Sequence, residues 1–134
     1  MKNLPILDTN LIIRFLTNDS VAQANKVKNL LENASKGSIE IPDIVLAEII
    51  YLLLSVYKLA KEDIVEKISL LIELDSISCN KNLIRKALDL FSNSQISYID
   101  SYLGALVLTE KNTKLYTFDK KLLKALGNGA IEPK

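Results

Sequence analysis

The alternation of short apolar stretches with helical patterns is the feature that most limits how this chain can fold. Residues 4–7 form an apolar run that stops at Asp8, and a second apolar run, residues 11–13, follows at once. We interpret the first run as a short buried strand and the second as part of a helix that begins at Asn10. In open α/β sheets, ligands bind beyond the carboxyl ends of the strands. This interpretation therefore places the carboxylate of Asp8 at the mouth of a crevice.

The same alternation continues along the chain. Helical spacing of apolar residues predicts helices over residues 10–16, 21–33, 43–57, 61–74, 82–91, 97–109 and 119–126. Apolar or alternating segments predict strands over residues 38–41, 76–79, 114–118 and 130–131, and residues 127–129 form a turn. Gly37 is expected to cap the second helix. Such an order favours a parallel sheet with helices on both faces, in one domain spanning residues 1–134.

The composition excludes several kinds of chemistry. The chain has no histidine, which rules out Ser-His-Asp and Cys-His catalysis, histidine acid–base chemistry and zinc sites with histidine ligands. The formal net charge is +1, so nucleic acid would be met by a local basic patch and not by bulk charge. The single cysteine, Cys79, fits a reducing compartment. No apolar run approaches the ~20 residues of a membrane span, and no signal-peptide pattern is present. We expect a cytoplasmic protein without a membrane partner.

Two acids interrupt apolar helical patterns. The helical neighbours of Glu48, three and four residues away on either side, are apolar or aromatic. A buried, unpaired carboxylate is costly and is normally paired or bound to metal. An ion pair with lysine or arginine, or a strip of exposure, would also explain Glu48. Asp100 lies in another apolar helix, where Ser97 and Asp100 have the spacing of a capping box.

Two further acids, Asp8 and Asp119, each follow a predicted strand. Taken singly, each would most simply cap the helix after it. Four carboxylates gathered at one place repel one another unless a cation binds. Mg²⁺ and Mn²⁺ prefer such oxygen ligands and bridge to phosphate. Bound metal can activate water and polarise a phosphodiester, so acids without histidine suit phosphodiester hydrolysis.

The chain resembles PIN-domain ribonucleases, and most closely the VapC toxins of toxin–antitoxin pairs. The resemblance is carried, in order, by Asp8-Thr9-Asn10, Val45-Leu46-Ala47-Glu48, Tyr98-Ile99-Asp100 and Thr117-Phe118-Asp119. It implies a three-layer α/β/α sandwich with a short central parallel sheet. It also implies an endoribonuclease that hydrolyses RNA with Mg²⁺ or Mn²⁺.

The resemblance assigns roles to individual positions. Asp8, Glu48, Asp100 and Asp119 would be the catalytic, metal-binding quartet, with Asp8 and Asp100 the most direct ligands. The positions implied to support the quartet or the substrate phosphate are Thr9, Asn10, Arg14 and Thr117. Ser101 stands where an alanine or another small residue is common. Gly104 stands where some relatives carry a further acid, so four acids carry over and a fifth does not.

Partners are expected on two kinds of surface. Basic residues that could track an RNA backbone are Lys111, Lys114, Lys120, Lys121 and Lys124, with Arg14, Lys26, Lys28, Arg85 and Lys86 as further candidates. The helix over residues 43–57 is apolar nearly all round and is predicted to be buried on most sides. Part of it would form a homodimer contact, or would receive a helix of the cognate antitoxin that the resemblance implies.

Two other functions remain open from the sequence. A Mg²⁺-binding phosphoacceptor domain also gathers acids at strand ends, but it needs an acidic pair after the first strand, where this chain has Asp8 followed by Thr9 and Asn10. A PIN-like module could instead bind RNA or protein without cutting it.

Overall fold

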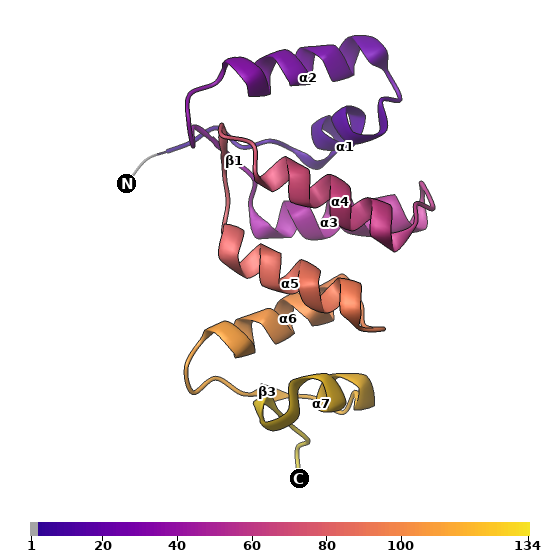
Figure 1. The fold of residues 1–134 in the computed structure, drawn as a ribbon, viewed down its shortest axis with the longest axis vertical. Coiled ribbons are helices and arrows are strands. Elements are labelled where there is room, and N and C mark those ends of the chain that lie inside the picture. Colours follow the sequence, from indigo (N-terminus) through magenta and orange to yellow (C-terminus); the bar gives the residue numbers. More distant parts are fainter. Residues whose placement is uncertain (1–2) are drawn as a thin grey trace. The chain divides into compact units, whose positions relative to one another are not determined.

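The structure is a computed structural model that describes residues 3–134, and it consists of two compact units. The first unit ends at Asn80 and the second begins at Lys81. Figure 1 shows short strands between longer helices in the first unit and again in the second. The prediction of one domain over residues 1–134, whose first two residues lie outside the described part, stays a prediction.

The first unit is built on a small parallel sheet. Its elements are α1 (Thr9–Thr17), α2 (Val21–Asn33), β1 (Ile39–Glu40), α3 (Asp43–Ser55), α4 (Lys61–Ile72) and β2 (Ile77–Ser78). Strands β1 and β2 run parallel, with Ile39 opposite Ile77. Ile6 adds one parallel bridge to Glu40, and the N–H of Leu7 donates to the Glu40 carbonyl at 3.1 Å. The predicted strand before Asp8 is therefore a single bridged, extended segment beside β1.

The core of the first unit lies between this sheet and α1, α3 and α4. Its fully buried side chains are nearly all isoleucine and leucine. They are Ile12, Ile41, Leu46, Ile49, Ile50, Leu53, Ile64, Ile68, Leu71, Ile72 and Ile77. Each such side chain contributes roughly 1.5–3 kcal/mol to folding. Helix α1 packs against both α2 and α3, so the segment that begins at Asp8 rests on a rigid support.

Two expectations for the first unit were wrong. Helix α3 is buried on one face only: Leu46 and Ile50 are fully buried, whereas Ile44 is 79% and Tyr51 is 66% exposed. Ile44 and Tyr51 are seven residues apart and share the outer face. Gly37 does not cap α2, which ends at Asn33. It forms the turn before β1 with a φ of +63°, a value that glycine adopts without strain.

The second unit combines a helical pair with another parallel pair of strands. Its elements are α5 (Lys81–Asn93), α6 (Tyr98–Thr109), β3 (Leu115–Tyr116), α7 (Lys120–Leu126), the 3₁₀ helix η1 (Gly127–Gly129) and β4 (Ala130–Ile131). Strands β3 and β4 run parallel, with Leu115 opposite Ala130. Helices α5 and α6 pack together, and the rings of Phe91 and Tyr98 meet edge to face with centroids 6.0 Å apart.

Gly104 marks a close approach of helices in the second unit. A β-carbon at this position would come within 3.1 Å of the side chains of both Leu90 and Leu126. Glycine inside a helix costs roughly 0.5–1 kcal/mol relative to alanine. Here it allows α6 to pack tightly against α5 and α7.

The two parallel strand pairs, with helices between successive strands, confirm the predicted mixed α/β class and the parallel direction. Among the helices of residues 3–134, none has both the length and the apolar character that crossing a membrane requires.

Candidate functional site

Asp8 joins the first extended segment to α1 and caps that helix. Its backbone is extended, and its Oδ1 accepts a hydrogen bond of 2.9 Å from the N–H of Leu11. The side chain is exposed. Its second oxygen, Oδ2, receives no hydrogen bond from the described residues of its unit. The cap fixes the carboxylate through one oxygen and leaves the other for a ligand.

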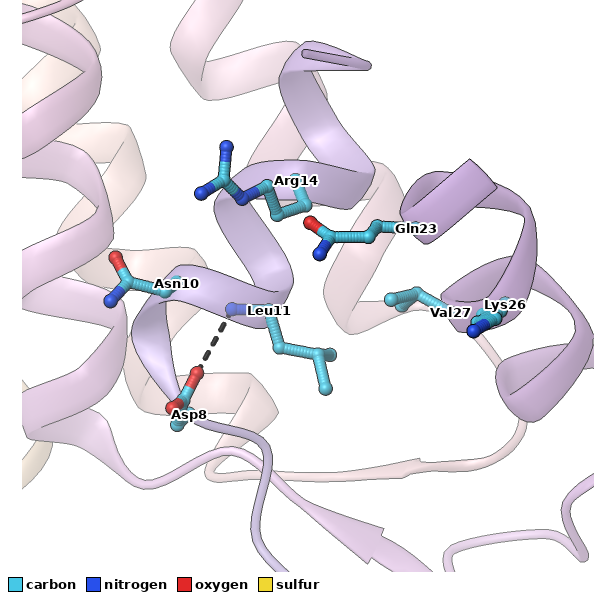
Figure 2. Close-up of a pocket in the computed structure, with 7 residues that line it drawn as sticks. All are labelled: Asp8, Asn10, Leu11, Arg14, Gln23, Lys26 and Val27. Atoms are coloured by element: carbon cyan, nitrogen blue, oxygen red, sulfur yellow. Dashed lines mark hydrogen bonds between the residues drawn. The ribbon is translucent and has the colours of Figure 1, made fainter. Parts of the chain in front are cut away.

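A hollow of about 430 Å³ lies between α1 and α2, with Asp8 at its edge. Figure 2 shows Leu11 of α1 and Val27 of α2 pointing toward one another across it. The polar side chains that line it are Asp8, Asn10, Arg14, Gln23 and Lys26. Three of the predicted site residues therefore meet there: Asp8, Asn10 and Arg14. Thr9 begins α1 but is not part of the lining.

Gln23 is the residue of this hollow that the sequence analysis missed. It lies on the first turn of α2, where its N–H donates to the Oγ of Ser20 at 3.3 Å. An exposed glutamine on an amphipathic helix carries no pattern that sets it apart from a solvated surface residue. Only the packing of α2 against α1 brings it near Asp8.

Glu48 lies in the middle of α3 and is exposed. Of the explanations left open for Glu48, a strip of exposure is the one that the structure shows, because Ile44 and Tyr51 beside it are exposed as well. The alternative of an ion pair is not observed: within residues 3–80, no lysine or arginine pairs with Glu48. Its carboxylate faces solvent, and no described residue of its unit neutralises its charge.

Asp100 lies in the first turn of α6, which Ser97 caps as predicted. The N–H of Asp100 donates to the Oγ of Ser97 at 3.1 Å, and the Ser101 hydroxyl donates to the Ser97 carbonyl at 2.8 Å. The side chain of Asp100 is half-buried. No ion pair joins it to a basic residue within residues 81–134. The capping hydrogen bond is made by the backbone N–H of Asp100. The carboxylate of Asp100 therefore takes no part in the cap.

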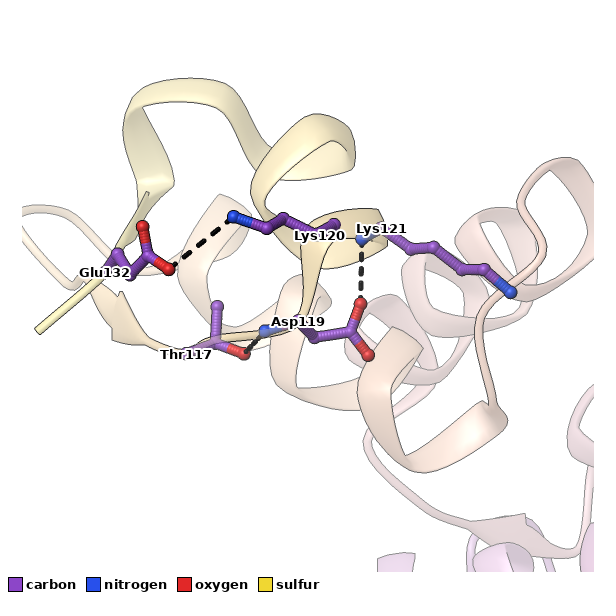
Figure 3. A network of polar contacts seen from close by, with 5 residues as sticks. All are labelled: Thr117, Asp119, Lys120, Lys121 and Glu132. Atoms are coloured by element: carbon purple, nitrogen blue, oxygen red, sulfur yellow. Dashed lines mark hydrogen bonds and ion pairs between the residues drawn. The ribbon is translucent and has the colours of Figure 1, made fainter.

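Asp119 follows β3 and caps α7 (Figure 3). Its Oδ1 accepts hydrogen bonds from the N–H of Lys121 at 2.8 Å and of Leu122 at 3.2 Å. The hydroxyl of Thr117 accepts from the N–H of Asp119 at 3.0 Å, and the N–H of Thr117 donates to the Ile131 carbonyl at 3.1 Å. Strand β4 thus holds Thr117, and Thr117 holds the backbone of Asp119.

The lysines near Asp119 behave as surface residues. Lys120 lies 3.7 Å from Glu132 in an exposed ion pair, a kind of contact that contributes about 0–1 kcal/mol. Lys114 donates to the Asn128 carbonyl at 2.7 Å. In the first unit, Lys28 pairs with Glu32 at 3.9 Å, whereas Lys26 lines the hollow.

The donor chemistry of the four predicted acids fits a hard divalent cation. Oxygen donors are the ligands that Mg²⁺ and Mn²⁺ prefer, and each carboxylate keeps at least one oxygen that no described residue of its own unit engages. Asp8 and Glu48 belong to the first unit, Asp100 and Asp119 to the second. Within the described residues of either unit, no group of three potential metal ligands occurs. A quartet at one place stays a prediction.

The comparisons with known proteins bear on the whole of this arrangement. The PIN domain family model matches residues 6–127, a segment that includes all four acids and parts of both units. No curated protein and no solved structure matches the chain. PIN domains are generally nucleases, and they usually use divalent metals. The seven α-helices and short parallel strands of residues 3–134 are consistent with the α/β/α fold of that family. The chain belongs to the PIN domain family.

Proposed function

We propose that this protein is an endoribonuclease that hydrolyses RNA phosphodiester bonds with Mg²⁺ or Mn²⁺. One observation carries the proposal: Asp8, Glu48, Asp100 and Asp119 all lie inside the segment that matches the PIN domain family. Within the described residues of its own unit, none of the four forms an ion pair with a lysine or arginine, so each carboxylate is available as a ligand. A bound cation would offset the mutual repulsion of the four acids at one place.

The residues of the chain have distinct parts in this proposal. Asp8, Glu48, Asp100 and Asp119 would hold the metal, which when bound supplies an activated water and polarises the scissile phosphodiester. The caps at α1 and α7 fix Asp8 and Asp119 through one oxygen each, so little side-chain freedom is lost on binding. Arg14, exposed at the hollow beside Asp8, would contact a substrate phosphate. Asn10 and Thr117 would support the acidic quartet or the substrate phosphate.

The proposed setting is a toxin–antitoxin pair in the cytoplasm. The outer face of α3 supports it, because Ile44, Tyr51 and Leu54 are exposed there. Apolar residues on one helical face suit a partner helix or a second copy of the chain. A cognate antitoxin and a homodimer are therefore the proposed protein partners.

The decisive experiment compares the wild type with Asp100→Asn on labelled RNA. Cleavage should require Mg²⁺ or Mn²⁺, cease with EDTA, and fall at least about 100-fold in Asp100→Asn, as expected for loss of a metal ligand. Glu110→Gln, at an exposed position just after α6, is the matched control and should cleave as the wild type does. Undiminished cleavage by Asp100→Asn would refute the assignment. RNA binding without metal-dependent products would favour a non-catalytic module.

The proposed role in a toxin–antitoxin pair is tested separately from the nuclease activity. The product of a small neighbouring reading frame should copurify with this protein and suppress its cleavage of RNA. Replacing Leu54, exposed on α3 and six residues beyond Glu48, by serine should weaken that copurification without slowing cleavage. A neighbouring product that neither binds nor inhibits would remove the toxin–antitoxin proposal and leave the nuclease untouched.

A further inference from the structure

The hollow between α1 and α2 has a polar lining that the acidic quartet does not account for. Only Asp8 among its lining residues belongs to the quartet. The side chains left over are Asn10 and Arg14 of α1 and Gln23 and Lys26 of α2. All four are exposed. Figure 2 shows the carboxamide of Gln23 between the two helices, whereas the side-chain ends of Asn10 and Arg14 point away from Leu11 and Val27.

The charge of this lining favours an anion. Neither Arg14 nor Lys26 forms an ion pair within residues 3–80. Lys28, two positions further along α2, does pair, with Glu32 at 3.9 Å. The lining therefore carries two cations and one carboxylate, and that carboxylate is the one the proposed function assigns to metal.

The remaining groups suit a nucleobase. Leu11 and Val27 point toward one another (Figure 2). Val27 is buried and Leu11 half-buried, so together they form an apolar floor on which the flat face of a base can rest. The carboxamides of Asn10 and Gln23 both donate and accept hydrogen bonds, as a base edge requires. The volume of about 430 Å³ lies within the ordinary range of about 300–1,000 Å³ for small-ligand sites.

We propose that this hollow binds the nucleotide that flanks the scissile phosphate of a single-stranded RNA, which rests on the proposed function. The base rests over Leu11 at the floor of the hollow, Gln23 contacts its edge, and Lys26 contacts the adjoining phosphate. Gln23 is then a specificity-determining residue, and Lys26 a residue for general affinity.

Binding can be tested without cleavage. Asp100→Asn protein is titrated with fluorescein-labelled adenosine, uridine and cytidine homopolymers, and anisotropy is followed at several salt concentrations. The double variant Asp100→Asn, Lys26→Ala should bind every homopolymer more weakly by about the same factor. The magnitude of its slope of log affinity against log salt should be smaller by about 0.7. The double variant Asp100→Asn, Gln23→Ala should keep the original slope but lose a preference of about fivefold or more among the homopolymers. Lys36→Ala, at an exposed position beyond the end of α2, and Asn25→Ala, on α2 but outside the lining, serve as matched controls.

Kinetics on the wild-type background separate this proposal from the nuclease itself. Lys26→Ala should raise KM about tenfold with kcat nearly unchanged, as expected for lost uniform binding. If the wild type cuts no RNA, the proposed nuclease function is refuted, while the anisotropy measurements still test binding in the hollow. The nucleotide site is refuted separately if the wild type cuts RNA but Gln23→Ala and Lys26→Ala do not differ from their controls. The quantities compared are the affinity, the salt slope and KM. Circular dichroism melts of each variant exclude misfolding as the cause of any loss.

Discussion

Asp8 and Ser20 cap neighbouring helices of the same unit with the same kind of bond, yet only Asp8 also lines the hollow between those helices. Asp8 accepts from Leu11 at 2.9 Å and Ser20 from Gln23 at 3.3 Å. A loss of capping and a loss of function can therefore be measured separately.

Replacing Asp8 by asparagine keeps the cap and removes the charge. Asparagine caps helices about as well as aspartate, so the free energy of unfolding should change by less than about 0.5 kcal/mol. RNA cleavage should fall at least about 100-fold. Ser20→Ala should show the reverse pattern, losing about 1 kcal/mol and keeping cleavage. Urea unfolding and initial rates are the measurements. Equal loss of cleavage in both variants would show that helix stability, not the carboxylate, sets activity.

Glu48 caps no helix and pairs with no residue among positions 3–80, so replacing it should affect function and not stability. Because the side chain is exposed, Glu48→Gln should change stability by less than about 0.5 kcal/mol. Metal-dependent cleavage should nevertheless drop. Glu66→Gln, exposed on α4, is the control. A Glu48→Gln enzyme with wild-type rates at every Mn²⁺ concentration would remove Glu48 from the quartet.

Metal should stabilise the folded chain. A ligand that binds only the folded state adds about 2.7 kcal/mol at 100 times its Kd, so Mn²⁺ should raise Tm and EDTA should reverse the rise. Asp119→Asn retains an acceptor for the N–H groups of α7 and should fold normally, but its Tm should respond less to Mn²⁺. The same response in Asp119→Asn and wild type would mean that the metal binds elsewhere.

The end of α3 is tied to the turn after α1 by a titratable bond. The Tyr57 hydroxyl donates to Oδ2 of Asp19 at 2.7 Å, and this hydrogen bond raises the pKa of Tyr57 above its ordinary value of 10.0. The stabilisation is fully present below the unfolded pKa, and it is lost as pH rises through the higher folded value. Asp19→Asn should move the Tyr57 pKa down toward 10.0, as followed by ¹³C NMR. Asp63→Asn, exposed on α4, should leave it in place. An unmoved pKa in Asp19→Asn would show that the hydrogen bond is not its cause.

Gly104 should not accept an acid. An aspartate there would crowd Leu90 and Leu126 and bury a charge, which should cost on the order of 3 kcal/mol or more. Leu108→Asp places the same charge at a 47% exposed position of the same helix and should cost less than about 1 kcal/mol. Urea unfolding compares the two. A Gly104→Asp protein as stable as Leu108→Asp would mean that the helices separate easily.

Helix positions followed from the sequence where local chemistry fixed them. Ser97 begins α6 as the predicted capping residue, and apolar spacing defined the interiors of α2 and α6. Strand lengths did not follow, because a ladder needs a partner from elsewhere in the chain. The predicted strands around β2 and β3 pair over two residues each.

Motifs mark candidate site residues such as Asp8 and Asp119 in the sequence, but they do not give their arrangement in space. For Glu48 the sequence left both burial and exposure open, because apolar neighbours signal burial only when they are buried themselves. Gln23 was missed because its importance arises from the packing of α2 on α1. The gathering of the four acids depends on long-range arrangement, and it stays a prediction.

The missing β-carbon at Gly104 has an evolutionary consequence. An acid at this position would meet Leu90 and Leu126 together. Gaining one there would therefore require smaller side chains at positions 90 and 126 as well, each of which weakens the packing of α6.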